Sequence, residues 1–514
     1  MSGPGHGRPP VRVTGQDRNP SSRSARRKVR VLHTFTADGA AALPGPQWLR
    51  HRRAEAFDDF VALPLPSEKE EVWRYSPIDQ LDLDTYRPAT LPDAQAGLTD
   101  PLAVAFVDGV AADIAHRSAL VVVHNGVPVA VDRSGLPDGV VLGALSEAEA
   151  EAGRRGGPGQ VLSGGDALVR LNDAFCPAVL AIDIPAGVAV PAPIVVVHWC
   201  DGADGDGGDG DGGQAPASFP RLAVTVGRGG QASLVEVLAG APADQRALVV
   251  PVTELSVGDG GHLSYVSLQV LGTGAWHLGR LAARAGRDAT VRTFTVGLGG
   301  AYDRSRTDAA AAGPGASTEL RSAYLGTGHQ VHDVRTLQDH EAPHTTSDLL
   351  CRGAVAGTSR SVYSGLIRVR RGAVRTVALQ TNNNLVLDER AHADSVPNLD
   401  IEENDVRCSH ASTVGPVDED QRYYLESRGV APDRAERLIV LGFFDDIVER
   451  SPVPEVVDRL RREVGLRLAE ALAIDPGESG PGASGPSRSG AGQPETAGPR
   501  WDPRQDQERT ATGD

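Results

Sequence analysis

One short segment near residue 410 carries two side chains that could bind a soft metal. The segment "DVRCSHAST" (405–413) places Cys408 and His410 two residues apart. If residues 405–410 form a strand, both side chains project from one face, about 6–7 Å apart along the backbone. A thiolate and an imidazole so placed can converge on one soft metal ion or a transient iron–sulfur species. Two ligands are too few for a tetrahedral ion, so others would have to arrive, and we expect them from another subunit. The alternative is a buried cysteine beside a hydrogen-bonded histidine.

A second candidate site is the histidine-rich segment "GHQVHDVRTLQDHEAPH" (328–344). Its four histidines are His329, His332, His340 and His344. They suggest a metal-dependent enzyme with a cupin-like site, although the HxH core with a following Glu at fixed spacing is missing. For each histidine the alternative is a structural or surface role.

Several kinds of catalytic motif are absent from the sequence. Its two lysines, Lys28 and Lys69, do not follow a glycine, so the chain has no P-loop, and we expect no nucleotide site in it. Neither a GxSxG elbow nor an HExxH motif occurs. The acidic, Gly-rich stretch 201–216 fits GxGxxG by chance, but its aspartates would repel a phosphate. It also lacks the full ligand set of a calcium loop, so we interpret it as a flexible acidic loop.

The region that would position these residues is rich in short, β-branched runs bounded by turn residues. From residue 286 the turn residues recur every 13–15 positions, at Gly286, Gly299, Gly313, Gly328, Pro343, Gly357 and Gly372. Evenly spaced strands without intervening helices indicate a β-solenoid or a β-sandwich. Many runs carry small or polar residues on both faces, which favours a parallel β-helix over residues 161–412.

Helical and low-complexity segments flank this core. Residues 46–160 read as a helical and mixed region that begins with a helix over 46–62, and residues 413–475 as a C-terminal helical region. The apolar stripe of the last helix fits either a core face or a docking face. Residues 1–45 and 476–514 are Gly/Pro/Ser/Arg-rich, and we expect a disordered basic arm and a disordered tail.

Charge and cysteine content restrict the class of protein. The net charge is −16, yet residues 1–31 carry eight Arg and Lys against one Asp, a net +7 that leaves −23 for the rest. A basic arm could touch nucleic acid, but the acidic body would repel it, so we expect no nucleic-acid partner. The four cysteines are far apart and include no CxxC pair, which favours a reducing cytoplasm. No apolar run is long enough to span a bilayer, and no signal peptide is apparent.

Four blocks of the sequence resemble the SufB/SufD family of iron–sulfur cluster assembly proteins. The most specific is "ALQTNNNLVLDERAHADSVPNLDIEENDVRCSHASTVGPVDEDQRYYLESRGV" (378–430). The others are "EVWRYSPI" (71–78), "PAGVAVPAPIVVVH" (185–198) and "DHEAPHTTSDLLCRGAVAGTSRSVYSG" (339–365). Together the resemblance covers roughly residues 46–475.

Within this family the chain resembles the SufD branch. SufB proteins carry a cysteine in the helix after the CSH position, where this chain has Leu425, so the SufB role of that cysteine is not expected here. Leu425 also argues against the hypothesis that this chain forms a homodimer with the function of SufB. Cys408 and His410 match the SufD pattern, with Ala411 in place of its usual Gly. The resemblance implies that His410 faces SufB across a heterodimer, with Cys408 beside it, and contributes to a transient cluster at the interface.

The resemblance further implies a right-handed parallel β-helix between helical ends and a non-catalytic scaffold subunit of a SufB–SufC2–SufD complex. The SufC ATPase would dock on the C-terminal helices, around residues 417–472. Reduced flavin could serve the complex, although the chain has no flavin motif. The residues that we expect at the docking surface are Tyr423, Tyr424, Phe443, Phe444 and Asp446.

Overall fold

The computed structural model of the chain describes residues 32–93, 97–147, 158–162, 164–202, 213–240 and 244–473. The predicted basic arm up to residue 31, most of the predicted acidic loop and the predicted tail lie outside the described residues.

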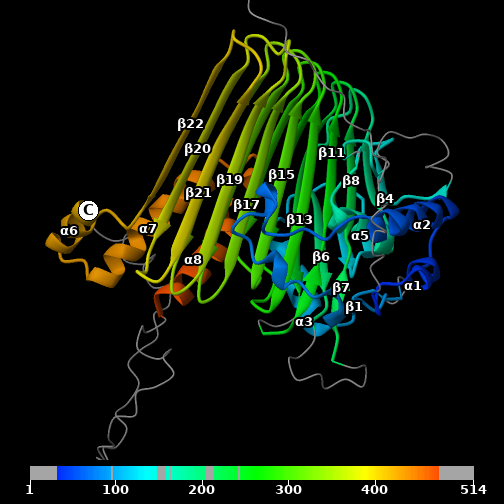
Figure 1. Cartoon of the computed structure of the whole chain (residues 1–514), viewed down its shortest axis with the longest axis horizontal. Helices are drawn as coiled ribbons and strands as arrows, with labels where there is room; N and C mark the ends of the chain where they lie inside the picture. The colour runs from blue at the N-terminus through cyan, green and yellow to red at the C-terminus, as the bar shows by residue number, and fades with distance from the viewer. Residues whose placement is uncertain are drawn as a thin grey trace, which may run out of the picture. The chain divides into compact units, whose positions relative to one another are not determined.

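The core is a β-solenoid whose successive strands alternate between two sheets (Figure 1). The strands of the larger sheet, in spatial order, are β21 (His392–Ile401), β19 (Arg360–Val369), β17 (Val331–His340), β15 (Tyr302–Ala311), β13 (Ala275–Ala285), β11 (Val252–Val257), β8 (Arg221–Val226), β5 (Leu180–Ile184) and β4 (Val141–Ala144), with β1 (Tyr86–Pro88), β7 (Ala215–Ser218) and β10 (Ala247–Val249) beside them. The second sheet runs β22 (Arg407–Gly415), β20 (Val377–Val386), β18 (Thr346–Val355), β16 (Ser317–Gly326), β14 (Thr290–Gly297), β12 (His262–Gln269), β9 (Gln231–Gly240), β6 (Ile194–Cys200), β2 (Ala119–His124) and β3 (Val127–Asp132). The predicted β-helix core is therefore confirmed.

The regularly spaced glycines lie in the turns between strands, for two physical reasons. Gly328, Gly357 and Gly372 have positive φ, a backbone conformation that glycine adopts without steric cost. Gly299 and Gly313 are needed for close packing of turns instead. A Cβ on Gly313 would lie 2.1 Å from the backbone N of Arg287, in the turn of the preceding coil. The period of the sequence thus records where successive turns stack.

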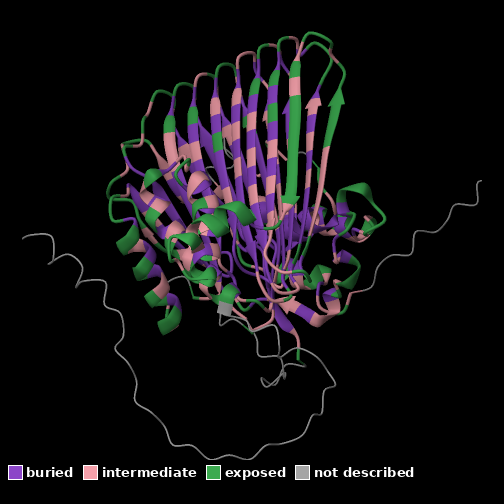
Figure 2. Cartoon of the chain, turned by 90° about the vertical axis from the view of Figure 1, so that its left-hand side faces the viewer, coloured by how far each residue is buried: buried purple, intermediate pink, exposed green. Residues whose placement is uncertain are grey.

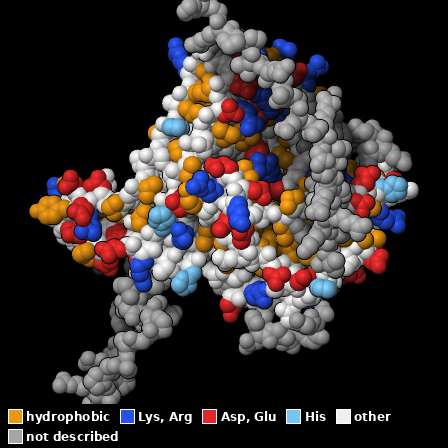
Figure 3. All heavy atoms as spheres, in the orientation of Figure 1, with side chains coloured by type: hydrophobic (Ala, Val, Ile, Leu, Met, Phe, Trp, Pro, Cys, Tyr) orange, Lys and Arg blue, Asp and Glu red, His pale blue; other side chains and the backbone are white. Residues whose placement is uncertain are grey.

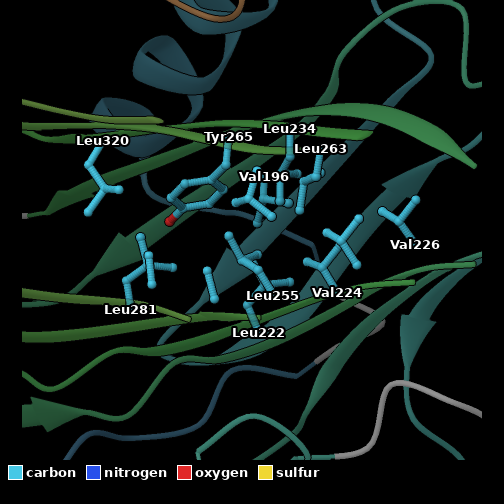
Figure 4. Close-up of a cluster of buried hydrophobic side chains, with 14 of the residues drawn as sticks. Val196, Leu222, Val224, Val226, Leu234, Leu255, Leu263, Tyr265, Leu281 and Leu320 are labelled. Carbon is cyan, nitrogen blue, oxygen red and sulfur yellow. The ribbon is translucent and has the colours of Figure 1, made fainter. Parts of the chain in front are cut away.

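Aliphatic side chains fill the lumen, the space between the two sheets (Figure 4). In β5 and β8 the lumen residues pair across the ladder, Leu180 with Leu222 and Ile182 with Val224. Because every second residue of each strand faces the lumen, each coil adds one layer to a continuous core.

The two ends of the solenoid are finished differently. At the N-terminal end β3 and β4 pair antiparallel with β2 and β5, and α2 packs on α5 beside them. At the C-terminal end the sheets stop at β21 and β22, each of which has a strand partner on one side only among the described residues. We call this second end the open end.

Helices flank the solenoid. They are α1 (Ala37–Ala42), α2 (Gln47–Ala62), α3 (Pro101–Asp113), α5 (Ala167–Phe175), α6 (Glu419–Ser427), α7 (Pro432–Val448) and α8 (Val457–Ala473), with 3-10 turns η1 (Glu71–Trp73), η2 (Ile78–Gln80), η3 (Leu83–Thr85) and η4 (Pro454–Val456). The apolar stripe of α8 packs in a core cluster through Leu460, Val464 and Leu468, so it is a core face. No described helix is both long and apolar enough to cross a membrane.

Three segment boundaries differ from those drawn on the sequence. Residues 32–45, placed in the disordered arm, include α1 and the buried Phe35, whose ring packs edge-to-face against Phe175 of α5 and against Phe219. Strand β2 pairs with β6, so the sheet begins before residue 161. Strand β22 continues to Gly415, beyond residue 412. Such limits depend on pairing between distant segments, which local composition does not reveal.

Candidate functional site

Cys408 and His410 lie on β22, the last strand of the second sheet. This strand pairs in parallel with β20, with Cys408 opposite Ala378 and His410 opposite Gln380. Because side chains alternate along a strand, Cys408 and His410 share one face. The predicted strand and the predicted common face are both present.

The shared face is the one that looks into the lumen. Ser412, two residues beyond His410, hydrogen-bonds Ser395 of β21 across the lumen, with 2.6 Å between the hydroxyl oxygens. Asn382 of β20 donates to the same Ser395 at 2.8 Å. Cys408 packs beside the small apolar cluster of Ile367, Val369, Ala373 and Ala378. Both candidate ligands therefore sit at the mouth of the lumen, inside the last coil.

The two side chains differ in exposure. Cys408 is half-buried, and burial raises the pKa of its thiol, against an opposing hydrogen bond from the backbone of Ala378. His410 is exposed. A thiol with a raised pKa stays protonated at neutral pH, so it becomes a strong ligand only when a metal displaces its proton. An exposed imidazole beside it can bind a metal without rearrangement of the core.

An unpaired, partly apolar rim surrounds this pair. Leu399 and Ile401 of β21 and Val414 of β22 are large apolar side chains exposed at the open end, where the edge strands are the most exposed of the sheets (Figure 2). Free backbone N–H and C=O groups run along both edges, a template for pairing with another chain. The sequence analysis missed this rim. The alternation in "PNLDI" was a local signal for it, but nothing local showed that the outer neighbour is absent.

The described residues offer an incomplete metal site. Among them no three His, Cys, Asp or Glu side chains are grouped so that they could hold a metal ion. Cys408 and His410 therefore remain a pair there, and a bound iron or cluster would need further ligands.

The four histidines at 329–344 do not form one site. The predicted histidine cluster of a metal-dependent, cupin-like enzyme is therefore wrong. His332 and His340 lie at opposite ends of β17, about 26 Å apart at 3.3 Å per residue. His332 hydrogen-bonds Asp303, and His340 hydrogen-bonds two hydroxyl groups. His340 is thus bonded through both ring nitrogens, whereas the buried Nε2 of His332 has no hydrogen-bond partner among the described residues. A strand long enough to cross the sheet separates these two histidines, although they are close in sequence.

Helix α6 places two predicted docking residues in solvent. Tyr423 is 73% exposed and Tyr424 58% exposed. The helix buries no residue and lies against α7, and in Figure 3 apolar and acidic side chains gather on it where it projects from the solenoid. Leu425, where the resemblance places a SufB cysteine, is half-buried on the same helix.

Helix α7 gives a mixed result. Phe444 is buried in a core cluster, so its predicted place on a docking surface is wrong. Phe443 is half-buried beneath the guanidinium of Arg352, and Asp446 forms an ion pair with that arginine at 2.5 Å. Arg352 comes from β18, so these contacts fasten α7 to the solenoid. Which side of the helix faces the sheet could not be read from the helix alone.

Comparison with known proteins shows which proteins this chain is similar to. Residues 209–443 match the family described as "SUF system FeS cluster assembly, SufBD core domain". The iron–sulfur cluster assembly protein SufD of Escherichia coli is 25% identical over 446 residues, which cover 85% of this chain and 95% of that protein. A SufBD family protein of Mycobacterium tuberculosis is 38% identical over 215 residues, covering 40% of this chain and 54% of its own length. The SufD of Bacillus subtilis is 30% identical over 211 residues, covering 41% and 48%. Residues 209–443 thus match the SufBD core domain, and over most of its length the chain is similar to SufD proteins of iron–sulfur cluster assembly.

Proposed function

We propose that this chain is a SufD-like accessory subunit, without catalytic activity of its own, that pairs through its open end with a SufB-like paralogue. The iron–sulfur cluster, which is the cargo, would be assembled at that interface. The observation that carries the proposal is the joint placement of Cys408 and His410 on the lumen face of an unpaired edge strand. A partner strand added to this edge would bring its own ligands next to them.

The site chemistry fits a role that needs the partner. Iron and sulfide are delivered as substrates, and metal binding must displace the proton of the Cys408 thiol. The raised pKa of that thiol keeps it from acting as a free thiolate in the isolated subunit. Assembly would then begin only after the partner has supplied the remaining ligands and covered the rim.

The ATPase would dock on α6 and the adjoining start of α7. Tyr423 and Tyr424 supply two large amphipathic side chains of the kind that is enriched in protein interfaces. Because Arg352 ties the second half of α7 to β18, a displacement of α6 could be passed to the solenoid. Reduced flavin could serve the complex, and we assign it no residue in this chain.

We place the complex in the cytoplasm. The relatives include bacterial SufD proteins and a chloroplastic protein of Arabidopsis thaliana that is 27% identical over 434 residues, 84% of this chain and 88% of that protein.

Co-expression of the full chain with SufB-like and SufC-like partners tests the assignment. A stable ternary complex should purify, and His410→Ala should leave it intact while lowering cluster formation about 10-fold or more, because a metal ligand is lost. His392→Ala is the matched control, since His392 is an exposed histidine on the other edge strand. Cluster formation at the wild-type level in the His410 variant would remove this residue from the mechanism.

The docking surface has a separate test. Replacement of both Tyr423 and Tyr424 by Ala should abolish retention of the ATPase in a pull-down and leave the pairing with the SufB-like subunit unchanged. Their side chains are largely in solvent, so the unfolding midpoint of the chain should hardly change. Retention of the ATPase by the double variant would contradict docking at α6.

A further inference from the structure

A row of three carboxamides lies directly beneath the open end. Gln380, Asn382 and Asn384 of β20 all face the lumen, with exposures of 2%, 0% and 3%. They are the register partners of His410, Ser412 and Val414 on β22. On β18, one strand further in, the same three positions are Leu349, Cys351 and Gly353. Of these strands, only β20, the strand next to the edge, has a carboxamide at all three positions.

The three amides are not equally satisfied. Asn382 donates to Ser395, and Asn384 accepts from the hydroxyl of Tyr324. Gln380 has no hydrogen-bond partner for either its oxygen or its nitrogen among the described residues. A buried amide left unpaired costs about 1–3 kcal/mol. Its place therefore calls for a partner that the described residues do not give it in this arrangement.

The fold makes room for this particular amide. A Cβ on Gly365 of β19, across the lumen, would lie 2.6 Å from Nε2 of Gln380 and 2.4 Å from the hydroxyl of Tyr363. Glycine at 365 thus lets the glutamine extend across the lumen. On β22 the register partner of Gln380 is His410, so the backbones of the two residues are separated by the strand spacing of about 4.8 Å.

A histidine that binds a metal through one ring nitrogen almost always donates the N–H of the other to an acceptor, which fixes the tautomer and the ring orientation. The described residues give the imidazole of His410 no hydrogen-bond partner. The side-chain oxygen of Gln380 is a buried, unused acceptor in the adjacent ladder position.

We propose that Gln380 is the positioning residue of His410: its amide oxygen accepts the imidazole N–H and leaves the other ring nitrogen free for iron. This inference rests on the proposed function, in which His410 is a ligand of the cargo. It adds a residue that never touches the metal and yet decides which nitrogen is presented. The partner subunit, by covering the open end, removes the water that otherwise competes for this hydrogen bond.

The test is the affinity of the purified, anaerobic complex for Fe(II), measured by competition with a chelator. Gln380→Leu removes the acceptor and should weaken binding about 10–100-fold. Leucine fits the column, since Leu349 occupies it one strand inward. Gln380→Glu keeps an acceptor oxygen and should restore binding to within a few-fold of wild type. Asn384→Leu is the matched control, equally buried but opposite Val414, and should leave the affinity unchanged.

The outcomes separate the two proposals. If His410→Ala leaves the Fe(II) affinity unchanged, the proposed function fails at this residue. If His410→Ala weakens binding and Gln380→Leu does not, the positioning role alone is overturned. Equal weakening by Gln380→Leu and Asn384→Leu would show a general effect of lumen repacking and would also overturn it. As a second readout, nitrogen NMR of the complex, with histidine labelled in this chain, should show a change in the ring tautomers of His410 in Gln380→Leu and none in Asn384→Leu.

Discussion

The two ends of the solenoid are built from the same two-sheet coil and are finished in opposite ways. At the N-terminal end the lumen pairs of β5 and β8 are aliphatic, and antiparallel strands and helices cover the last ladder. At the open end β20 and β22 bring an amide row, a thiol, an imidazole and a hydroxyl into the same space, and no strand of the described part of the chain covers them.

A single lumen column shows the change. In the second sheet it runs, strand by strand, Ile194, Leu234, Tyr265, Thr293, Leu320, Leu349, Gln380 and His410. Aliphatic residues in the early coils supply burial free energy. The polar residues in the last two positions, Gln380 and His410, reduce this burial free energy, because a buried amide needs hydrogen-bond partners. The polar lumen of the open end fits the proposed role in partner recognition, whereas the aliphatic lumen of the closed end supplies stability.

The largest contrast should appear when the same truncation is made at both ends. Leu255 and Leu399 occupy one lumen column of the larger sheet, but Leu255 is fully buried and Leu399 is 41% exposed. Leu255→Ala should lower the free energy of unfolding by about 2–5 kcal/mol through lost burial and a cavity. Leu399→Ala should lower it by less than about 1 kcal/mol.

Urea unfolding of the isolated chain, followed by circular dichroism, measures both. Equal losses would mean that the open end is as much a part of the core as the closed end. With the SufB-like partner bound, the Leu399 variant should become the more costly one for complex stability.

A smaller contrast concerns pH. His340 is the one titratable residue in the lumen column that begins at Ile184 and ends at Ile401. Burial lowers its pKa to about 4, against a weaker opposing effect of Asp339. The unfolded chain therefore binds a proton more readily, and stability should fall as the pH drops from about 6.5 towards about 4, by up to about 3 kcal/mol.

His340→Gln should remove this part of the pH dependence, and His329→Gln, in an exposed turn, should not. Unfolding free energies of the three proteins between pH 4 and pH 7 provide the measurement. A slope that persists unchanged in the His340 variant would mean that other groups carry the acid sensitivity.

The sequence predicted the repeating coil of the solenoid. It could not predict the features of the open end, which depend on how distant strands pair. The spacing of Gly299, Gly313 and Gly328 gave the coil, since each must fit a turn or touch the turn below. The shared face of Cys408 and His410 followed from the period of a strand. That no strand of the described residues pairs with the outer side of β22 is a property of the whole fold, and so the rim was missed.

The errors have the same origin. The burial of Phe444 depends on which side of α7 meets the sheet, and the separation of His332 from His340 depends on the full length of β17. The unpaired amide of Gln380 was invisible within "LQTNNNL", because its significance comes from strands on three sides.

The smallest effect on the chain itself, and the sharpest test of the open end, comes from proline on β22. The N–H of Arg407 bonds to Thr376, so the N–H groups of odd-numbered residues point to β20 and those of even-numbered residues point outwards. Ser412→Pro removes an outward N–H and the exposed hydrogen bond to Ser395, so it should lower the unfolding midpoint only slightly. It should nevertheless prevent pairing with the SufB-like subunit. Thr413→Pro removes an inward N–H and should destabilise the last coil. Size-exclusion chromatography with the partner, together with thermal unfolding of each variant, separates the two effects. If the Ser412 variant still pairs, the subunits do not meet by adding strand to strand, and the polar lumen must be covered by side chains of the partner instead.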